Sequence, residues 1–338
     1  MAIVPTHNDS VRARLGTWQE QLKSAIRDPF ELCLHLKLPS QIARDAATGS
    51  QGFSLFAPLP FVNRIQPGNV DDPLLLQLLP QKSELVESDD YLLDPVNDLS
   101  HSIAPGVIQK YAGRALLITT GACAIHCRYC FRRHFPYQEA PAGDQAWQES
   151  LRSIAQDDSI KEVILSGGDP LMLNDQSLSR LVEQIEAIPH IRRLRIHTRL
   201  PIMIPGRVTD ELLTTLSTTR LDVWFVLHSN HANEFDSDVG QAIKKINSLG
   251  IPLLNQSVLL KGINDDPDTL VQLSETLIEH KAIPYYLNSL DKVHGAAHFA
   301  VPISTGQTII KHMRERLPGF AVPRFVVDDD QGSKTLLA

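Results

Sequence analysis

The strongest constraint on the fold is an alternation of short apolar runs and helical patterns that begins near residue 113. Six runs rich in aliphatic and β-branched residues predict strands at 115–119, 162–165, 194–197, 223–228, 253–260 and 284–287. Amphipathic patterns predict helices at 145–156, 178–188, 211–217, 241–249, 267–280 and 306–316. Because strands that alternate with helices pair in parallel, the sequence predicts an α/β fold with a curved or wound parallel sheet.

The first third of the chain predicts a different, mainly helical and irregular region. Residues 9–27 and 29–36 show helical spacing of apolar positions, and the first of these helices has cap candidates at positions 8–10. Residues 53–108 are rich in Pro, Asp and Leu and predict few elements. We therefore divide the chain into an N-terminal region (1–106), a sheet-forming core (107–300) and a C-terminal segment (301–338).

The composition excludes several classes of function. A net charge of −7 argues against a surface for nucleic acid or for an anionic membrane, because both require an excess of basic residues. No apolar run approaches the roughly 20 residues that a membrane-spanning helix needs, and the N-terminus lacks the apolar stretch of a signal peptide. We therefore expect a soluble, cytoplasmic protein that binds neither nucleic acid nor membranes.

Polar residues follow the predicted strands at the points where these strands end. They form the segments 166–169, 197–199 and 228–230. In barrels built from alternating strands and helices, the carboxyl ends of the strands carry the active site. The sequence therefore predicts a site at this end of the sheet.

Three of the four cysteines lie within eight residues, at Cys123, Cys127 and Cys130. They occupy the loop after the first predicted strand of the alternating pattern. Three thiolates in one loop can bind three irons of a four-iron cluster, which leaves the fourth iron open for catalysis. Zinc would need a fourth ligand such as His126, since Cys33 is remote and is typical of a core residue. Three unliganded cysteines are the remaining alternative, which their tight clustering disfavours.

A second candidate feature is Lys334, which lies in a loop of small residues. Most lysines at such positions are solvated. The apolar, strand-like run FAVPRFVV at 320–327 precedes it, however, and predicts a segment that packs against the core.

Longer strings of residues resemble known families. The string CAIHCRYC at 123–130 resembles the radical S-adenosylmethionine signature. Further strings are similar to the lysine 2,3-aminomutase family, namely KYAGR at 110–114, CRYCFRRHF at 127–135, LLNQSVLLKGIND at 253–265 and YYLNSLDKVHGAAHF at 285–299. This resemblance implies a partial (β/α)6 radical SAM barrel with an N-terminal helical cap and a short C-terminal segment that carries a pyridoxal phosphate lysine.

The resemblance also implies the reaction and the cofactors. Members of the family use a [4Fe-4S] cluster, S-adenosyl-L-methionine and pyridoxal 5′-phosphate, because migration of an amino group requires both a carbon radical and a π-system. The chain is most similar to the branch that converts free L-lysine to (R)-β-lysine for modification of elongation factor P. That branch implies a functional link to elongation factor P and its lysyl ligase, and a reductant such as flavodoxin or ferredoxin.

The resemblance assigns roles to individual residues. It implies that Lys334 binds pyridoxal phosphate, that Arg132 binds the substrate carboxylate and that Asp291 and Asp328 bind its ε-ammonium. The family has a run of glycines before this lysine, where the present chain has Asp-Gln-Gly-Ser at 330–333. Cofactor contacts are implied for Lys110, Arg114, Ser166, Gly167, Gly168, Asp169, His228, Asn255 and Gln256. Surface charges and hydrogen-bonded core residues are the structural alternatives for these positions.

Two other functions stay open at this point. One is an aminomutase for glutamate or arginine, and a glutamate enzyme would need a cation such as the adjacent Lys292 in place of Asp291. The other is a non-catalytic iron–sulfur protein, which would have no need of Lys334.

Overall fold

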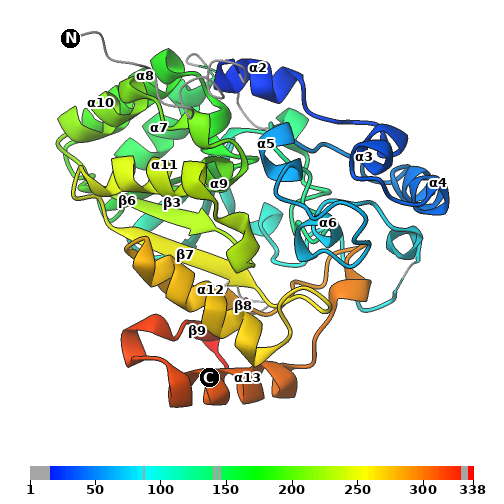
Figure 1. Cartoon of the computed structure of the whole chain (residues 1–338). Coiled ribbons are helices and arrows are strands. Elements are labelled where there is room, and N and C mark those ends of the chain that lie inside the picture. Colours follow the sequence, from blue (N-terminus) through cyan, green and yellow to red (C-terminus); the bar gives the residue numbers. More distant parts are fainter. Residues whose placement is uncertain (1–15, 87, 140–142, 144–145, 329–333) are drawn as a thin grey trace, which may run out of the picture.

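A computed structural model describes residues 16–86, 88–139, 143, 146–328 and 334–338. Its centre is one sheet in which ten strands follow one another in sequence order (Figure 1). Seven neighbouring strands run parallel: β3 (Arg114–Thr120), β4 (Glu162–Gly167), β5 (Arg193–Thr198), β6 (Asp222–His228), β7 (Leu253–Val258), β8 (Ala282–Asn288) and β9 (Arg324–Asp328). The predicted parallel sheet is thus confirmed, and β9 extends it beyond the six expected strands.

Antiparallel strands extend the sheet at both edges. β1 (Ser102–Ala104) and β2 (Val107–Tyr111) precede β3, and β10 (Lys334–Leu336) pairs with β9. The sheet order runs from β1 to β10, and no pairing between these two strands closes it within the described residues. The sheet is therefore a partial barrel, as the sequence predicts.

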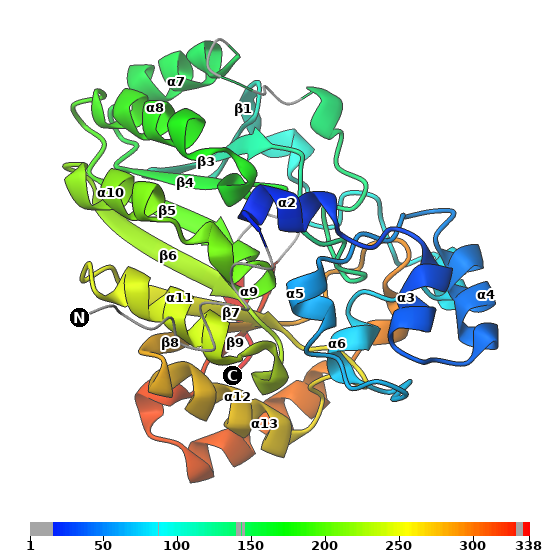
Figure 2. The same ribbon diagram turned by 45° about the horizontal axis from the view of Figure 1, so that its top comes forward.

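Helices connect the parallel strands and pack on the convex side of the sheet (Figure 2). They are α7 (Trp147–Gln156), α8 (Asp175–Glu186), α9 (Leu200–Met203), α10 (Asp210–Thr218), α11 (Ser237–Asn247), α12 (Pro267–Glu279) and α13 (Ile303–Arg316). Side chains of Asn174, Thr209, Asp236 and Asp266 cap the first turns of α8, α10, α11 and α12. These caps satisfy amide groups that a helix leaves free, so each loop residue fixes where its helix begins.

The N-terminal helices lie together on the other side of the molecule, drawn in blue in Figure 1. They are α2 (Trp18–Lys23), α3 (Pro29–His35), α4 (Ser40–Gly49), α5 (Leu59–Val62) and α6 (Pro73–Leu76). The predicted second helix is confirmed as α3. Positions 9–15 of the first predicted helix lie outside the described residues. In the described part a capping box of Thr17 and Glu20 begins α2 at Trp18, and the helix ends at Lys23 rather than at residue 27. The cap candidates at positions 8–10 lie outside the described residues.

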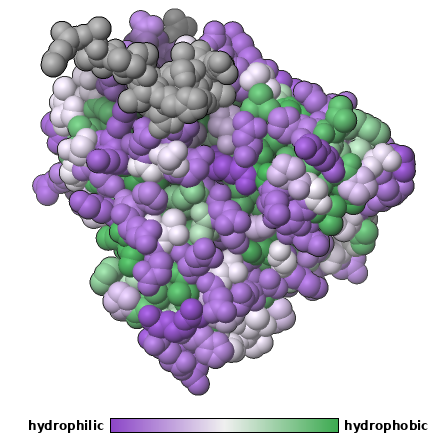
Figure 3. Space-filling view, in the orientation of Figure 1, coloured by the Kyte–Doolittle hydropathy of each residue, from purple (hydrophilic) through white to green (hydrophobic). Residues whose placement is uncertain are grey.

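One hydrophobic cluster joins the two parts of the structure. It contains Phe61 from the N-terminal helices, Trp147 from the outer helices, and Phe225 and Phe325 from the sheet. The visible surface is mainly hydrophilic with scattered apolar patches (Figure 3). Among the described residues, no helix has both the length and the apolar character that crossing a membrane would require.

Candidate active site

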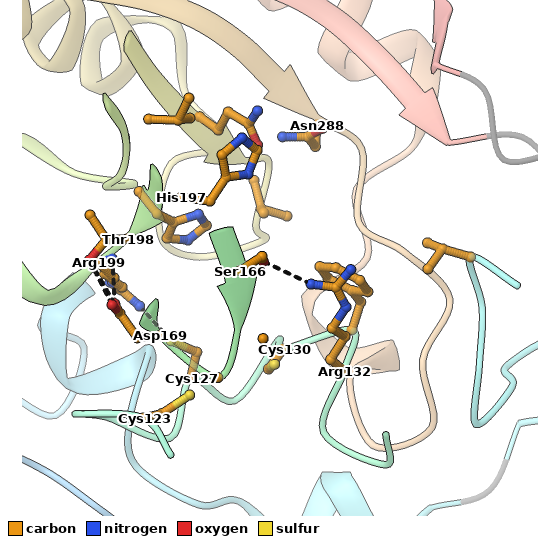
Figure 4. Close-up of a pocket in the computed structure, with 18 of the residues that line it drawn as sticks. Cys123, Cys127, Cys130, Arg132, Ser166, Asp169, His197, Thr198, Arg199 and Asn288 are labelled. Atoms are coloured by element: carbon orange, nitrogen blue, oxygen red, sulfur yellow. Dashed lines mark hydrogen bonds between the residues drawn. The ribbon is translucent and has the colours of Figure 1, made fainter. Parts of the chain in front are cut away.

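A cavity of about 480 Å³ lies at the carboxyl ends of the parallel strands. It brings together nearly all the predicted site residues, although they are spread over more than 200 positions of the chain. The lining includes Lys110, Arg114, Cys123, Cys127, Cys130, Arg132, Ser166, Gly167, Gly168, Asp169, His228, Gln256, Asp291, Asp328 and Lys334. In Figure 4 the cysteines lie on one side of this cavity, Asn288 lies on the opposite side, and Ser166 and Arg132 lie between them.

Asn255 is the exception, and its position corrects the prediction that it faces the site. Side chains of consecutive strand residues point to opposite faces, so Gln256 and Asn255 cannot both reach the cavity. Gln256 lines the cavity. The Asn255 amide instead accepts hydrogen bonds from the Ser229 backbone N–H and hydroxyl, and donates to the Ser229 carbonyl and to Ser257. It fixes the turn after β6.

The end of β4 supports the cysteine loop through close backbone contact. The Gly168 N–H donates to the Thr120 carbonyl, and the Asp169 N–H donates to the Ala122 carbonyl, both at 2.8 Å. A Cβ atom on Gly168 would lie only 2.2 Å from the Ala122 carbonyl oxygen. Gly167 has a φ of +122°, which other residues rarely adopt. Gly167 therefore lets the end of β4 lie against Thr120, and Gly168 lets the next residue lie against Ala122, which precedes Cys123.

Asp169 has a structural task within this arrangement. Its carboxylate accepts hydrogen bonds from the Thr198 hydroxyl and from the backbone N–H groups of Leu171, Arg199 and Leu200. Figure 4 shows Asp169 pointing towards Thr198 and Arg199. The carboxylate thus joins the ends of β4 and β5, and it sits at the cavity wall with these partners already in place.

The three cysteine thiols suit a cluster better than a single ion. Burial raises the pKa of Cys123 well above its usual range, and burial raises that of Cys130 to about 11. These thiols therefore need an electropositive ligand to lose their protons. Among the described residues, no three Cys, His, Asp or Glu side chains converge on one metal ion. A four-iron cluster does not require such convergence, since each thiolate binds a different iron.

A buried carboxylate that sequence reasoning missed holds two of the predicted cations. Asp98 accepts a hydrogen bond from Arg132 Nε at 2.7 Å and binds Lys110 Nζ at 2.8 Å. Burial alone would raise the pKa of Asp98, but the Arg132 and Lys110 charges outweigh this and lower it. Arg132 Nη1 also donates to the Ser166 hydroxyl at 3.0 Å (Figure 4). Asp98 therefore fixes the orientation of Arg132.

Lys334 lies at the other end of the cavity. Its Nζ donates to Asn288 Oδ1 at 2.7 Å and to Asp328 Oδ2 at 2.8 Å. Lys334 and Asp328 are register partners in the β9–β10 pair, so the backbone itself brings them together. Burial and the nearby Asp328 charge raise the pKa of Asp291 to about 7. The loop 329–333, which differs from the glycine run of the family, lies outside the described residues.

A polar network also lies beneath the cysteine loop. The Tyr129 hydroxyl contacts His228 Nε2 at 2.8 Å, and Arg199 Nη1 donates to this hydroxyl at 2.6 Å. Arg199 also donates to Gln77 and Glu234. The pKa of His228 lies well below its usual range because the ring is buried and faces the Arg199 charge. His228 is therefore neutral at physiological pH.

Comparisons with known proteins decide the family. The radical SAM superfamily profile matches residues 117–273. L-Lysine 2,3-aminomutase of Haemophilus influenzae is 44% identical over 322 residues, which covers 95% of each chain. The chain belongs to the L-lysine 2,3-aminomutase family. The aminomutase of Escherichia coli is also 44% identical, over 91% of this chain and 90% of the relative, and that of Clostridium subterminale is 32% identical, over 93% and 76%.

As a member of this aminomutase family, the protein is an isomerase that transfers an amino group within its substrate by radical SAM chemistry. The alternative of a non-catalytic iron–sulfur protein is therefore wrong. A glutamate enzyme would need a cation in the cavity near Asp291. Lys292 does not provide it, because its side chain is 63% exposed and pairs with Asp90.

Proposed function

We propose that this aminomutase uses a [4Fe-4S] cluster, S-adenosyl-L-methionine and pyridoxal phosphate to convert L-lysine to (R)-β-lysine. The observation that carries the proposal is the shared cavity, in which three cysteine thiols and the Lys334 ammonium face the same space. Radical generation and amine binding need such proximity, because a reactive radical must meet its substrate without crossing solvent.

Cys123, Cys127 and Cys130 would hold the cluster, whose open iron would bind S-adenosylmethionine and supply the radical. The cavity wall beside the cysteines includes Ser166, His228 and Gln256, whose polar side chains could contact that cofactor. It also includes Gly168, whose lack of a side chain would let the cofactor approach the backbone. His228 is neutral and held by Tyr129, so it offers a fixed hydrogen-bonding group without adding charge.

Lys334 would hold pyridoxal phosphate, which supplies the π-system through which nitrogen moves. An amine must lose a proton before it can attack a carbonyl carbon. Asp328 Oδ2 lies 2.8 Å from Nζ and can accept that proton. Arg114 lies over the Tyr111 ring at 3.9 Å and has no carboxylate partner among the described residues, which suits it to the cofactor phosphate. Lys110 is already held by Asp98 and by the Val96 carbonyl.

The charges of the cavity support a dibasic amino acid as substrate. Arg132 donates to Asp98 through Nε and to Ser166 through Nη1, so its Nη2 has no partner among the described residues and can bind a carboxylate. Asp291 and Asp328 both line the cavity, and their mutual repulsion is relieved when a cation lies between them. This pair favours lysine over glutamate or an apolar amino acid.

We further propose that the product serves elongation factor P. The resemblance of the chain to the β-lysylation branch of the family supports this role. The cavity volume of about 480 Å³ suits a free amino acid beside its cofactors rather than a folded protein. Free β-lysine would then pass to the lysyl ligase, and flavodoxin or ferredoxin would supply the electrons.

The proposal is tested under anaerobic conditions with reconstituted cluster, pyridoxal phosphate, S-adenosylmethionine, a reductant and L-lysine. Chiral chromatography should detect (R)-β-lysine, and Lys334→Ala and Cys127→Ala should each abolish it. Lys292→Ala is the matched control, since this lysine is exposed and should be replaceable without loss. Turnover of arginine or glutamate with no turnover of lysine would contradict the substrate assignment. Mass spectrometry of elongation factor P incubated with product and ligase tests the final step.

A further inference from the structure

Arg199 connects the cysteine loop with three other parts of the structure. It follows β5, and its side chain is 7% exposed. Nη1 donates to Cys127 Sγ at 2.8 Å and to the Tyr129 hydroxyl at 2.6 Å. Nη2 donates to Gln77 Oε1 at 2.6 Å and to Glu234 Oε2 at 3.1 Å. The guanidinium group is therefore held on both terminal nitrogens, and Nη1 is directed at a cysteine sulfur.

The surroundings keep this guanidinium charged. An arginine guanidinium stays protonated in proteins, and the buried Glu234 carboxylate pairs with this one at 3.1 Å. Other buried arginines have different partners. Arg128 binds Glu84, and Arg207 binds Asp175 together with the carbonyls of Leu171 and Leu173. Arg199 thus places a permanent positive charge against a thiol of the cysteine loop.

We propose that Arg199 is a positioning residue that raises the reduction potential of the cluster through its hydrogen bond to Cys127. This inference rests on the proposed ligation of the cluster by Cys127. Reduction adds one electron from a low-potential flavin or iron–sulfur donor to the oxidised cluster, and no bond forms or breaks. The reduced cluster carries one more negative charge, so a fixed cation beside its sulfur stabilises the reduced form more than the oxidised form.

The same contacts connect the N-terminal region to the cluster site, because Gln77 of this region binds Arg199. Gln77 follows α6 and is completely buried, and its side chain receives hydrogen bonds from Arg199, Asn230 and Tyr129 while donating to Glu234. It therefore fixes the guanidinium through Nη2, the nitrogen that does not contact Cys127. The N-terminal helices thus hold in place the charge that acts on the cluster.

The test compares Arg199→Gln with Arg207→Gln, since Arg207 is also buried and its contacts do not include a cysteine. Redox titration of the reconstituted full chain, followed by electron paramagnetic resonance, measures the reduced fraction at each potential. Arg199→Gln should lower the equilibrium constant for cluster reduction at least about tenfold, which is about 59 mV for a one-electron couple. Arg207→Gln should leave the potential unchanged. Equal potentials for wild type and Arg199→Gln would overturn the inference.

A second variant distinguishes electrostatics from loosening of the site. Glu234→Gln removes the anion that partly neutralises Arg199, and it should raise the potential. A merely loosened site admits water, which stabilises the more highly charged reduced cluster and raises the potential in both variants. Opposite shifts therefore support the inference, and shifts of the same sign overturn it. If Arg199→Gln retains too little cluster, an unchanged potential in Glu234→Gln overturns it alone. Absence of a cluster from the wild-type protein would refute the ligation itself, and the inference with it.

Discussion

Replacement of Gly168 by alanine tests how tightly β4 supports the cysteine loop. The added Cβ would lie 2.2 Å from the Ala122 carbonyl oxygen and 2.8 Å from the Gly121 carbonyl carbon. Because ordinary contact begins at 3.4 Å, the two backbones must separate by roughly 1 Å, and no flexible side chain can absorb the shift. Overpacking of this kind costs about 1 to 3 kcal/mol in the free energy of unfolding.

These energies convert to a measurable change in Tm. An unfolding entropy of about 2.1 cal/mol/K per residue gives about 0.7 kcal/mol/K for this chain, so Tm should fall by about 1 to 4 °C. Ala122 is adjacent to Cys123, and the displaced loop should also bind less iron after reconstitution. Gly319→Ala is the matched control, since its added Cβ meets no atom within 4 Å. If Gly168→Ala equals this control in Tm and in iron content, the argument from backbone contact is refuted.

Three further substitutions test the remaining parts of the site. Asp98→Asn should destabilise the protein by about 3 to 5 kcal/mol in urea unfolding at neutral pH, because it leaves Lys110 and Arg132 without their buried anion. The folded pKa of Asp98 is lowered, so the wild-type carboxylate becomes protonated as pH falls below about 4. The difference in free energy of unfolding between wild type and Asp98→Asn should therefore shrink at that pH. For Asp291, whose pKa is raised to about 7, KM for lysine should fall as pH rises through 7, and Asp291→Asn should remove this dependence. Asn255→Ala should cost about 1 to 3 kcal/mol in stability yet leave cofactor affinity unchanged, and a selective loss of cofactor binding would contradict its assignment to the turn after β6.

The sequence allowed the strands to be predicted because parallel strands are buried on both faces. β4, for example, is buried along its whole length and carries the apolar run 163–165. The short helices α5 and α6 were missed, since four residues are too few to show a helical period. The helix predicted at 9–27 was too long at its carboxyl end, because α2 ends at Lys23 with Ser24 as its C-cap.

Site residues that form a motif with their sequence neighbours could be predicted. Site residues whose partners are distant in sequence were missed. The cysteines and the segment 166–169 form compact motifs. Asp98, in contrast, lies in a region without a recognisable pattern, and its partner Arg132 is 34 residues away. Arg199 belongs to the predicted polar segment 197–199, but its hydrogen bond to Cys127 spans 72 residues. Partners this distant are determined by packing rather than by sequence spacing.

The position of Lys334 on β10 has a consequence for how the enzyme is made. Chains emerge from the ribosome in sequence order at about 5 to 20 residues per second, and early segments begin to fold first. The cysteine loop and the strands up to β8 are therefore synthesised before β9 and β10 can pair. The half of the cavity that would hold iron can be assembled while the amine that would hold pyridoxal phosphate is still missing. For the two cofactors proposed above, the topology thus favours insertion of the cluster before binding of pyridoxal phosphate.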